Sequence, residues 1–471
     1  MVDWWSFARA DAGQRRRRLL APVDPVLRVC LAIAAAVTKV GSLSGQRLVH
    51  SGDLIWDEIG ALPLADHRFW FNERPVTVPL LHRLVGFSEP RVVTVQIACD
   101  VIAWTLLAQV VSKFAAARGA GLVAFALVLG LSLTSGVQGW DLVIRSESAA
   151  MSFLVLALAG AVAITVAPAH GRAWRVGWSA AALTGALLSA FARDNVAYVL
   201  VIVASFVPLG ALLAAERPLD LRAWARRAAP VAVVSLGLFA VAAASRANEH
   251  AAARFEGPLM NVIFERVLGS PGTLAYFERE LGMPVSPAVR ARRGHTLPRG
   301  AAGVKSLAPF RAWVLQDGYS GYQRYLLTHF PATARAAWRS FEAVSGDVED
   351  RHTHRGRSRS SRFLDSFFVD PLAVNPLASV ALLGAAGLLG LFSGRGGARV
   401  LAAFCLCCLA VSLTQAYVCF HGDAMEVGRH SVNVGLFLRL AAVIAVCLGV
   451  DRGSALAERL LFRRAPGADP G

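Results

Sequence analysis

The chain has 471 residues, of which 55% are hydrophobic, and its formal net charge at pH 7 is +16. The apolar residues gather in runs of about 18 to 22, which match the hydrocarbon core of a bilayer and exclude an ordinary soluble domain. A basic charge of this size would suit nucleic-acid binding in a soluble protein. Here the arginines concentrate in short loops on alternate sides of the apolar runs, which is the positive-inside pattern of membrane proteins.

The runs predict an all-α polytopic membrane protein with about ten transmembrane helices, because only helices and closed barrels satisfy the backbone inside lipid. Counting arginines in the short loops places both termini in the cytoplasm of a multi-pass protein of the plasma membrane. The expected spans are 23–43, 90–111, 120–133, 149–167, 176–192, 196–213, 229–244, 371–392, 400–417 and 431–450.

The segments outside the spans differ in length and composition. Residues 1–22 and 451–471 are expected to be a basic cytoplasmic N-terminus and a cytoplasmic tail, flanking spans 1–7 (23–245) and spans 8–10 (371–450). Loop 44–89 is acidic and amphipathic, and a long outer loop, 246–370, separates spans 7 and 8. The seven cysteines lie in or beside apolar runs, so neither a disulfide framework nor a zinc site is predicted.

The first outer loop is unusual for a solvated connection. It places Asp57 and Glu58 beside Trp56 and carries Glu73 and Arg74 a short distance further on, among tryptophans, prolines and leucines. Carboxylates next to apolar surface are either paired or put to use. The loop is therefore predicted to form short amphipathic helices on the membrane surface and to carry chemistry.

Other charges converge on the same outer level. The even-numbered spans begin there, and a helix N-terminus carries about half a positive charge with unsatisfied N–H donors, which favours phosphate. The spans themselves are expected to hold few ionisable residues. The charged residues placed at these helix starts are Arg145 with Glu147, Arg193 with Asp194, and Arg429 with His430.

Each group has a structural alternative. The acidic pair could provide a helix cap and first-turn acid, the Glu73–Arg74 pair could orient a turn, and Arg145 could reach lipid headgroups. Arg193 and Asp194 could close two helix ends as a pair. Arg429 and His430 could belong to an ordinary helix start.

Taken together, this layout resembles the GT-C superfamily, whose multi-span glycosyltransferases take a sugar from a polyprenyl-phosphate donor on the extracytoplasmic face. The resemblance lies in a cytoplasmic N-terminus followed by a first outer loop with an acidic pair, here Asp57–Glu58 after Trp56. The polyprenyl-phosphate-dependent mannosyl- and aminoarabinosyltransferases carry a similar pair, and their essential carboxylate would correspond to Asp57. The chain departs from them in lacking a large folded C-terminal outer domain.

The resemblance implies an inverting transfer to a glycan, lipid or protein of the cell envelope, with Asp57 as general base and Glu58 and Glu73 positioning the acceptor. Arg145, Arg193, Arg429 and His430 would stabilise the leaving phosphate. The carboxylate pair also leaves open a divalent metal, Mg²⁺ or Mn²⁺. The alternatives are a transporter or flippase of a lipid-linked or anionic substrate, which would need ionisable residues within the spans, and a non-catalytic scaffold.

Overall fold

The structure, a computed structural model, describes residues 23–43, 55–115, 118–165, 171–214, 221–296, 305–345, 359–368, 375–393, 396–422 and 431–463, with Leu372 and Ala424. The described part of the chain is helical and has no strand, so the all-α prediction is confirmed. Each expected span coincides with a helix. These helices are α2 (Val23–Leu43), α6 (Glu89–Ser112), α7 (Arg118–Ser132), α9 (Ser146–Thr165), α10 (Arg172–Ala190), α11 (Val196–Leu213), α12 (Leu221–Ala251), α22 (Pro376–Ser393), α23 (Gly397–Gly422) and α25 (Val432–Arg463).

Among the described residues, six of these helices are long and apolar enough to cross a membrane: α6, α9, α11, α12, α23 and α25. A seventh span arises if α7 and the segment after it count as one, bent by 51° at the break. That segment comprises α8 (Ser135–Gln138) and η1 (Gly139–Leu142). The chain is thus a multi-span membrane protein by the length and composition of its helices.

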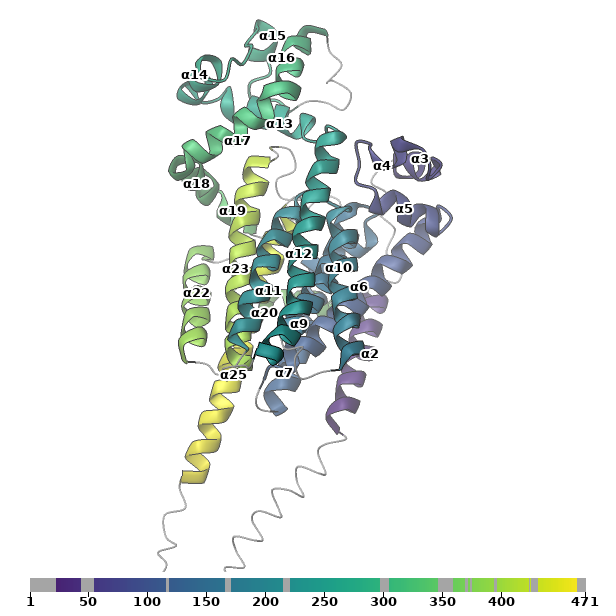
Figure 1. Cartoon of the computed structure of the whole chain (residues 1–471), viewed down its shortest axis with the longest axis vertical. Coiled ribbons are helices and arrows are strands. Elements are labelled where there is room, and N and C mark those ends of the chain that lie inside the picture. The colour runs from purple at the N-terminus through teal and green to yellow at the C-terminus, as the bar shows by residue number, and fades with distance from the viewer. Residues whose placement is uncertain are drawn as a thin grey trace, which may run out of the picture.

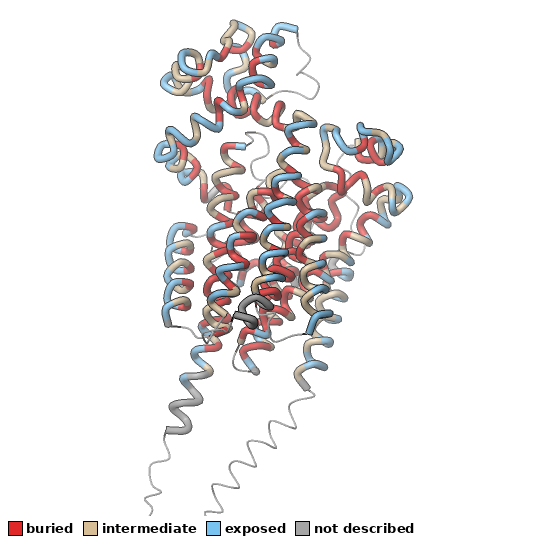
Figure 2. Tube along the Cα trace, in the orientation of Figure 1, coloured by how far each residue is buried: buried red, intermediate tan, exposed pale blue. Residues whose placement is uncertain are grey.

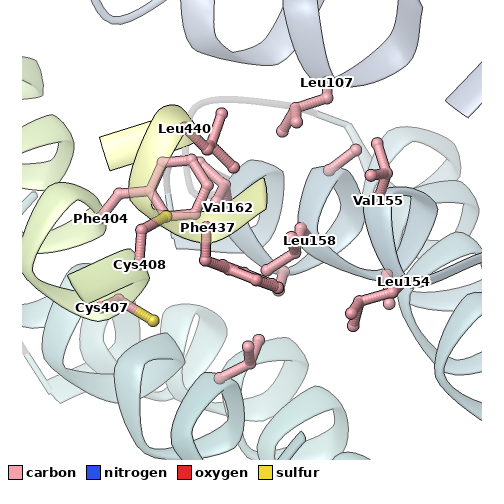
Figure 3. Packing of buried hydrophobic residues seen from close by; sticks show 14 of the residues in the cluster. Leu107, Leu154, Val155, Leu158, Val162, Phe404, Cys407, Cys408, Phe437 and Leu440 are labelled. Carbon is pink, nitrogen blue, oxygen red and sulfur yellow. The ribbon is translucent and has the colours of Figure 1, made fainter. Parts of the chain in front are cut away.

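The core of the bundle is one cluster of buried apolar side chains from most of the bundle helices, among them α9, α23 and α25. Figure 3 shows Leu154 and Leu158 of α9, Phe404 of α23 and Phe437 of α25 in one cluster, and all four side chains are buried. Cys407 and Cys408 belong to the same cluster and act there as small apolar residues. Because α9 is buried along nearly its whole length, its N-terminus is held in place by packing on all sides.

Helices α9 and α10 approach each other unusually closely through glycine. A Cβ on Gly160 would lie 2.5 Å from the Ala182 nitrogen, and one on Gly185 would lie 2.6 Å from the Ala157 nitrogen. Small residues at such positions let two membrane helices make backbone contact. This contact sets the position of the α10 C-terminus beside the start of α9.

Helices α3 to α5 of the first outer loop and α13 to α18 of the second lie at one end of the bundle, and the start of α2 and the end of α25 lie at the other; α20 lies beside α7 and α8 (Figure 1). The first loop forms α3 (Ile55–Ala61), α4 (His67–Trp70) and α5 (Thr77–Leu84). Helix α12 continues past its apolar run to Ala251, so the long loop begins later than expected. The long loop forms α13 (Glu256–Val262), η3 (Ile263–Val267), α14 (Pro271–Arg279), α15 (Pro287–Arg290), η5 (Lys305–Leu307), α16 (Ala308–Trp313), η6 (Val314–Gly318), α17 (Tyr319–Thr328), α18 (Phe330–Arg339), α19 (Phe341–Ser345) and α20 (Arg359–Phe368).

Helices α13 to α17 enclose a second apolar core, which we call the cap core. Phe264, Phe277 and Phe310 are fully buried in it, and Figure 2 shows the buried stretches on the inner sides of these helices. The cap core rests on the bundle through Tyr322, whose hydroxyl lies 3.2 Å from Nδ1 of His421 at the end of α23. The long loop is therefore a small folded unit docked on a membrane helix.

Candidate active site

The first loop is anchored on the C-terminal end of α10. The Thr77 backbone N–H donates to the Phe191 carbonyl at 2.9 Å, and the Thr77 hydroxyl donates to the Leu188 carbonyl at 2.9 Å. The last carbonyls of a helix lack partners within it, so a loop that supplies donors there is held firmly. Since Leu188 and Phe191 shortly precede Arg193, this anchor places the loop next to one of the predicted cationic residues.

Within the loop, Asp57 of α3 pairs with His82 in the last turn of α5. The Asp57 Oδ1 atom lies 2.8 Å from His82 Nδ1. The His82 side chain is 5% exposed and that of Asp57 is 45% exposed, so the carboxylate has one face on the histidine and another open. Glu58 is exposed; as the next residue on the helix, it projects about 100° away from Asp57.

Glu73 and Arg74 lie close to the same helix. The Arg74 guanidinium is centred 5.5 Å above the Trp56 ring, a cation–π contact, and its backbone N–H donates to Asn72 Oδ1 at 2.7 Å. Glu73 is exposed at the tip of the loop. The structure thus brings Arg74 beside the residue that precedes Asp57.

A second group of charges is buried at the start of α9. Glu147 stands in the first turn of α9 with 1% of its surface exposed, and Arg145 and Arg193 are each 7% exposed. Arg193 Nη1 lies 3.5 Å from Glu147 Oε1. Two guanidinium groups beside a helix N-terminus favour the binding of an anion.

Asp194 is held by a residue that sequence reasoning did not single out. Arg254, just after α12, binds both carboxylate oxygens, with Nε 2.9 Å from Oδ2 and Nη2 2.8 Å from Oδ1. Arg254 also donates to the Asn72 carbonyl at 3.3 Å and to Asn248 Oδ1 at 2.8 Å. Asp194 therefore belongs to a clasp that joins the first loop, the start of α11 and the end of α12.

The clasp and the Thr77 anchor tie the first loop to the end of α10 and to Asp194, at the start of α11. Arg193 and Asp194, although adjacent, point to different partners. Arg429 and His430 lie outside the described residues, so their predicted role stays a prediction.

The expectation that the spans hold few ionisable residues is wrong for α2 and α6. Lys39 of α2 contacts the Asp100 carboxylate of α6 and lies 2.8 Å from Asp141 Oδ2 in η1. Trp104 Nε1 donates to Asp100 Oδ1 at 3.0 Å, and the Ser148 hydroxyl donates to Asp141 Oδ1 at 2.8 Å. We call Lys39, Asp100 and Asp141 the buried triad. A lysine and an aspartate inside apolar runs were the signal that could have revealed it.

His82 and Arg254 were also missed as functional candidates. Histidine is a common companion of a working carboxylate, and a buried arginine at a helix end commonly binds one. Their partners are 25 and 60 residues away in the sequence. Sequence separation of this size leaves no periodic pattern to follow.

In the part of the chain that the structure describes, no group of three or more histidine, cysteine, aspartate or glutamate side chains is placed to hold a metal ion. Asp57 and Glu58 point in different directions from one helical turn, so they do not form two ligands on a single side. Any Mg²⁺ or Mn²⁺ at this loop would have to take Asp57 as its protein ligand, with substrate phosphate and water filling the other positions.

Comparison with known proteins leaves the family open. No model of a protein family matches the sequence, and no curated protein matches it. A solved structure with a similar arrangement is the archaeal oligosaccharyltransferase AglB from Archaeoglobus fulgidus, in complex with an inhibitory peptide and a dolichol-phosphate, at a TM-score of 0.47 and 13% identity. The match covers 94% of this chain and 52% of that one, so the chain spans about half the length of that protein. At this level of similarity, the chemistry has to be argued from the residues.

The fold and the site together define an all-α, multi-span membrane protein. At one end of its bundle it carries two folded loops, the first of which holds the half-exposed Asp57 carboxylate, and Arg145 and Arg193 are buried near the start of α9.

Proposed function

We propose that the chain is a membrane glycosyltransferase that moves a sugar from a polyprenyl-phosphate donor to a hydroxyl of a cell-envelope glycan, lipid or protein. The observation that supports this most is the junction of the two charge groups. The loop that carries the open Asp57 carboxylate is hydrogen-bonded to the end of α10, shortly before buried Arg193. A base and a cationic phosphate site are the two parts that such a transfer needs.

In the proposed reaction, Asp57 takes the proton of the acceptor hydroxyl while the acceptor oxygen forms a bond to the anomeric carbon of the sugar. The bond from that carbon to the phosphate oxygen breaks, and its electron pair leaves with the polyprenyl phosphate. Attack from the side opposite the leaving group inverts the anomeric centre. A positioned base of this kind contributes about 10² to 10⁴ in rate.

The leaving phosphate would be received by Arg145 and Arg193 at the N-terminus of α9. Arginine keeps its charge and binds phosphate oxygens in pairs, and the helix N-terminus adds to the positive potential. Glu147 would hold Arg193 in position between substrates. Arg429 and His430 are proposed as further phosphate ligands, and Arg74, Glu58 and Glu73 as contacts to the sugar or the acceptor.

The proposed topology puts the site on the extracytoplasmic side of the plasma membrane, with both termini in the cytoplasm. The short loops between the spans support this, because their arginines concentrate at the end of the bundle away from the site; the long outer loop is also rich in arginine, but the rule does not apply to loops of that length. A polyprenyl tail would then lie in the bilayer beside the spans while its phosphate reaches the start of α9.

A transporter or flippase is the second candidate, since the buried triad places ionisable groups within spans, as transport proteins do. All three side chains of the triad are at most 1% exposed and are bonded to one another, to Trp104 and to Ser148. A network satisfied in this way favours a fixed structural role over a binding site along a path.

The deciding experiment measures sugar transfer by purified protein from a panel of polyprenyl-phosphate sugars. Asp57→Asn is expected to lower turnover by at least 10² with donor binding retained. The matched control is Asp317→Asn, the same chemical change at an exposed carboxylate of η6. The result that would contradict the enzyme is substrate movement in proteoliposomes with no sugar transfer from any donor. If Asp57→Asn also left that movement unchanged, the protein would be a transporter.

A further inference from the structure

We propose that His82 is the positioning residue for Asp57: a neutral imidazole that donates its Nδ1 hydrogen to Asp57 Oδ1, so that Oδ2 is the oxygen that receives the acceptor proton. The inference rests on the proposed function, because it specifies how the base of that reaction is held. It assigns a role to a histidine that lies outside the charge groups predicted from the sequence.

The burial of the two ring nitrogens decides which one carries the proton. Nδ1 faces Asp57 Oδ1 at 2.8 Å, whereas Nε2 is buried and has no hydrogen-bond partner among the described residues. A proton on Nε2 would be a buried donor without an acceptor, which is costly. A neutral ring with its hydrogen on Nδ1 leaves no buried donor at Nε2 and gives Asp57 a donor.

The backbone brings the two side chains together through a close approach of α3 and α5. A Cβ on Gly60 of α3 would lie 2.9 Å from the Phe87 ring and 2.9 Å from the Pro79 carbonyl oxygen. Only glycine leaves room for this contact. The chain then turns sharply after α5, with positive φ at both Gly86 and Phe87, which lays the Phe87 ring against α3.

The α5 helix is itself fixed at both ends. At its start, Thr77 is bonded to the end of α10, and at its end the Phe87 N–H donates to the His82 carbonyl at 2.8 Å. His82 therefore stands on a segment tied to the bundle, and Asp57 is aligned to the phosphate site through it. A fixed position of the reacting carboxylate matters, because a displacement of about 1 Å can lower the rate by a factor on the order of 10².

The arrangement also specifies the path of the proton. It passes from the acceptor oxygen to Oδ2 of Asp57, which becomes a carboxylic acid; after the product leaves, water takes this proton and restores the carboxylate. His82 keeps its own hydrogen throughout. A relay in which His82 receives the proton would need access to Nε2, and that atom is enclosed.

The test compares two substitutions at one position in the full-length protein. In His82→Asn, the side-chain amide can stand where Nδ1 stood and donate to Asp57, whereas His82→Leu removes the donor and keeps an apolar filling. We expect His82→Asn to keep kcat within about fivefold of the wild type, and His82→Leu to lose about 10² in kcat with little change in the KM for the donor.

Each alternative result has a distinct meaning. If His82→Asn is as impaired as His82→Leu, the ring itself carries the proton and the inference is overturned. If both variants match the wild type while Asp57→Asn is inactive, His82 does not position the base and the proposed function stands. If Asp57→Asn keeps full activity, Asp57 is not the general base, and both the proposed function and this inference are contradicted.

If His82→Leu does not fold, a spectroscopic measurement can still show which ring nitrogen of His82 carries the hydrogen. In protein labelled with ¹⁵N-histidine, the signals lost in His82→Asn identify the two ring nitrogens. We expect the hydrogen on Nδ1 in the wild type. Finding it on Nε2, or on both nitrogens at neutral pH, would overturn the inference.

Discussion

At the scale of single residues, the site depends on charges that are buried next to charges of the opposite sign. Arg193 and Glu147 are a buried pair from different parts of the fold: Glu147 is in the first turn of α9, and Arg193 lies between α10 and α11. Taking such charges out of water is expensive, and their pairing recovers part of that cost. The contact therefore stabilises the site only as long as both members are present.

We expect Glu147→Gln to lower the free energy of unfolding by about 3 kcal/mol or more, because it leaves the Arg193 guanidinium buried with less compensation. Replacing both members, in Glu147→Gln/Arg193→Met, is expected to cost less than the single substitution. Chemical unfolding in detergent measures the free energy of unfolding of the single and the double variant. Equal losses in the single and the double variant would show that the two side chains do not act as a pair.

The sequence indicated these residues but not their partners. Arg145, Glu147, Arg193 and Asp194 could be found because they stand where apolar runs begin, which is a local property. That Arg193 faces Glu147 and Asp194 faces Arg254 depends on how four helices are arranged, and neighbouring positions in the chain do not carry that information.

At the scale of elements, the sequence was a good guide to the helices of the bundle. Apolar length defines them, and the expected first span even has the observed bounds of α2. The ends were less predictable where a helix outruns its apolar run, as α12 does at Arg246 and Glu249, because a helix in water can continue on polar residues. The close contact of α9 with α10 also escaped prediction, since a single glycine in a helix has no definite meaning by itself.

That contact gives a prediction for Gly185. In Gly185→Leu the added side chain would collide with the backbone of α9 near Ala157, so the helices would have to separate. We expect loss of several kcal/mol or failure to fold, beyond the usual 1–3 kcal/mol of an overpacked core. Gly177→Leu is the control, because a Cβ at Gly177 of the same helix meets nothing within 4 Å. Thermal unfolding in detergent would separate the two, and similar midpoints would contradict the contact.

The docking of the cap core on α23 gives a prediction about pH. Burial raises the pKa of the Tyr322 phenol above its ordinary value. The unfolded chain therefore loses this proton first, as the pH rises through about 10. The stabilising contribution of Tyr322 is complete at neutral pH and is lost above about pH 10.

We expect the unfolding midpoint of the wild type to fall more steeply between pH 9 and 11 than that of Tyr322→Phe, which cannot ionise at this position. At neutral pH, the same variant should lose about 1 kcal/mol, the usual worth of one hydrogen bond. Parallel pH curves for the two proteins would contradict the raised pKa.

At the scale of the whole molecule, the clasp of Arg254 joins the two outer loops to each other and adds to the Thr77 and Tyr322 contacts that hold them on the bundle. It connects the first loop at Asn72, the start of α11 at Asp194 and the end of α12 at Asn248. The loops were predicted separately from the sequence, each from its own composition. The contact between the two loops could not be predicted, because it depends on Arg254, which lies beyond the end of an apolar run.

We expect Arg254→Gln to loosen the first loop without unfolding the bundle. Losing the bidentate contact should raise the amide hydrogen exchange of residues 67–74 by about tenfold, which corresponds to about 1.4 kcal/mol, while exchange in α9 stays unchanged. Transfer activity should fall with it, because Asp57 stands on the same loop. Exchange that rises equally in both regions would show that Arg254 supports the whole bundle.

The buried triad also bears on how the protein is made. Lys39 is in α2, and both of its partners are synthesised later, at Asp100 in α6 and Asp141 after α7. Until they arrive, α2 carries an ammonium group with no counter-charge in its apolar stretch, and a charge there opposes release into lipid. Helix α2 must therefore wait in a polar or proteinaceous environment, such as the insertion machinery, until α7 and the segment after it have been made. The order of synthesis and the order of assembly thus differ for α2.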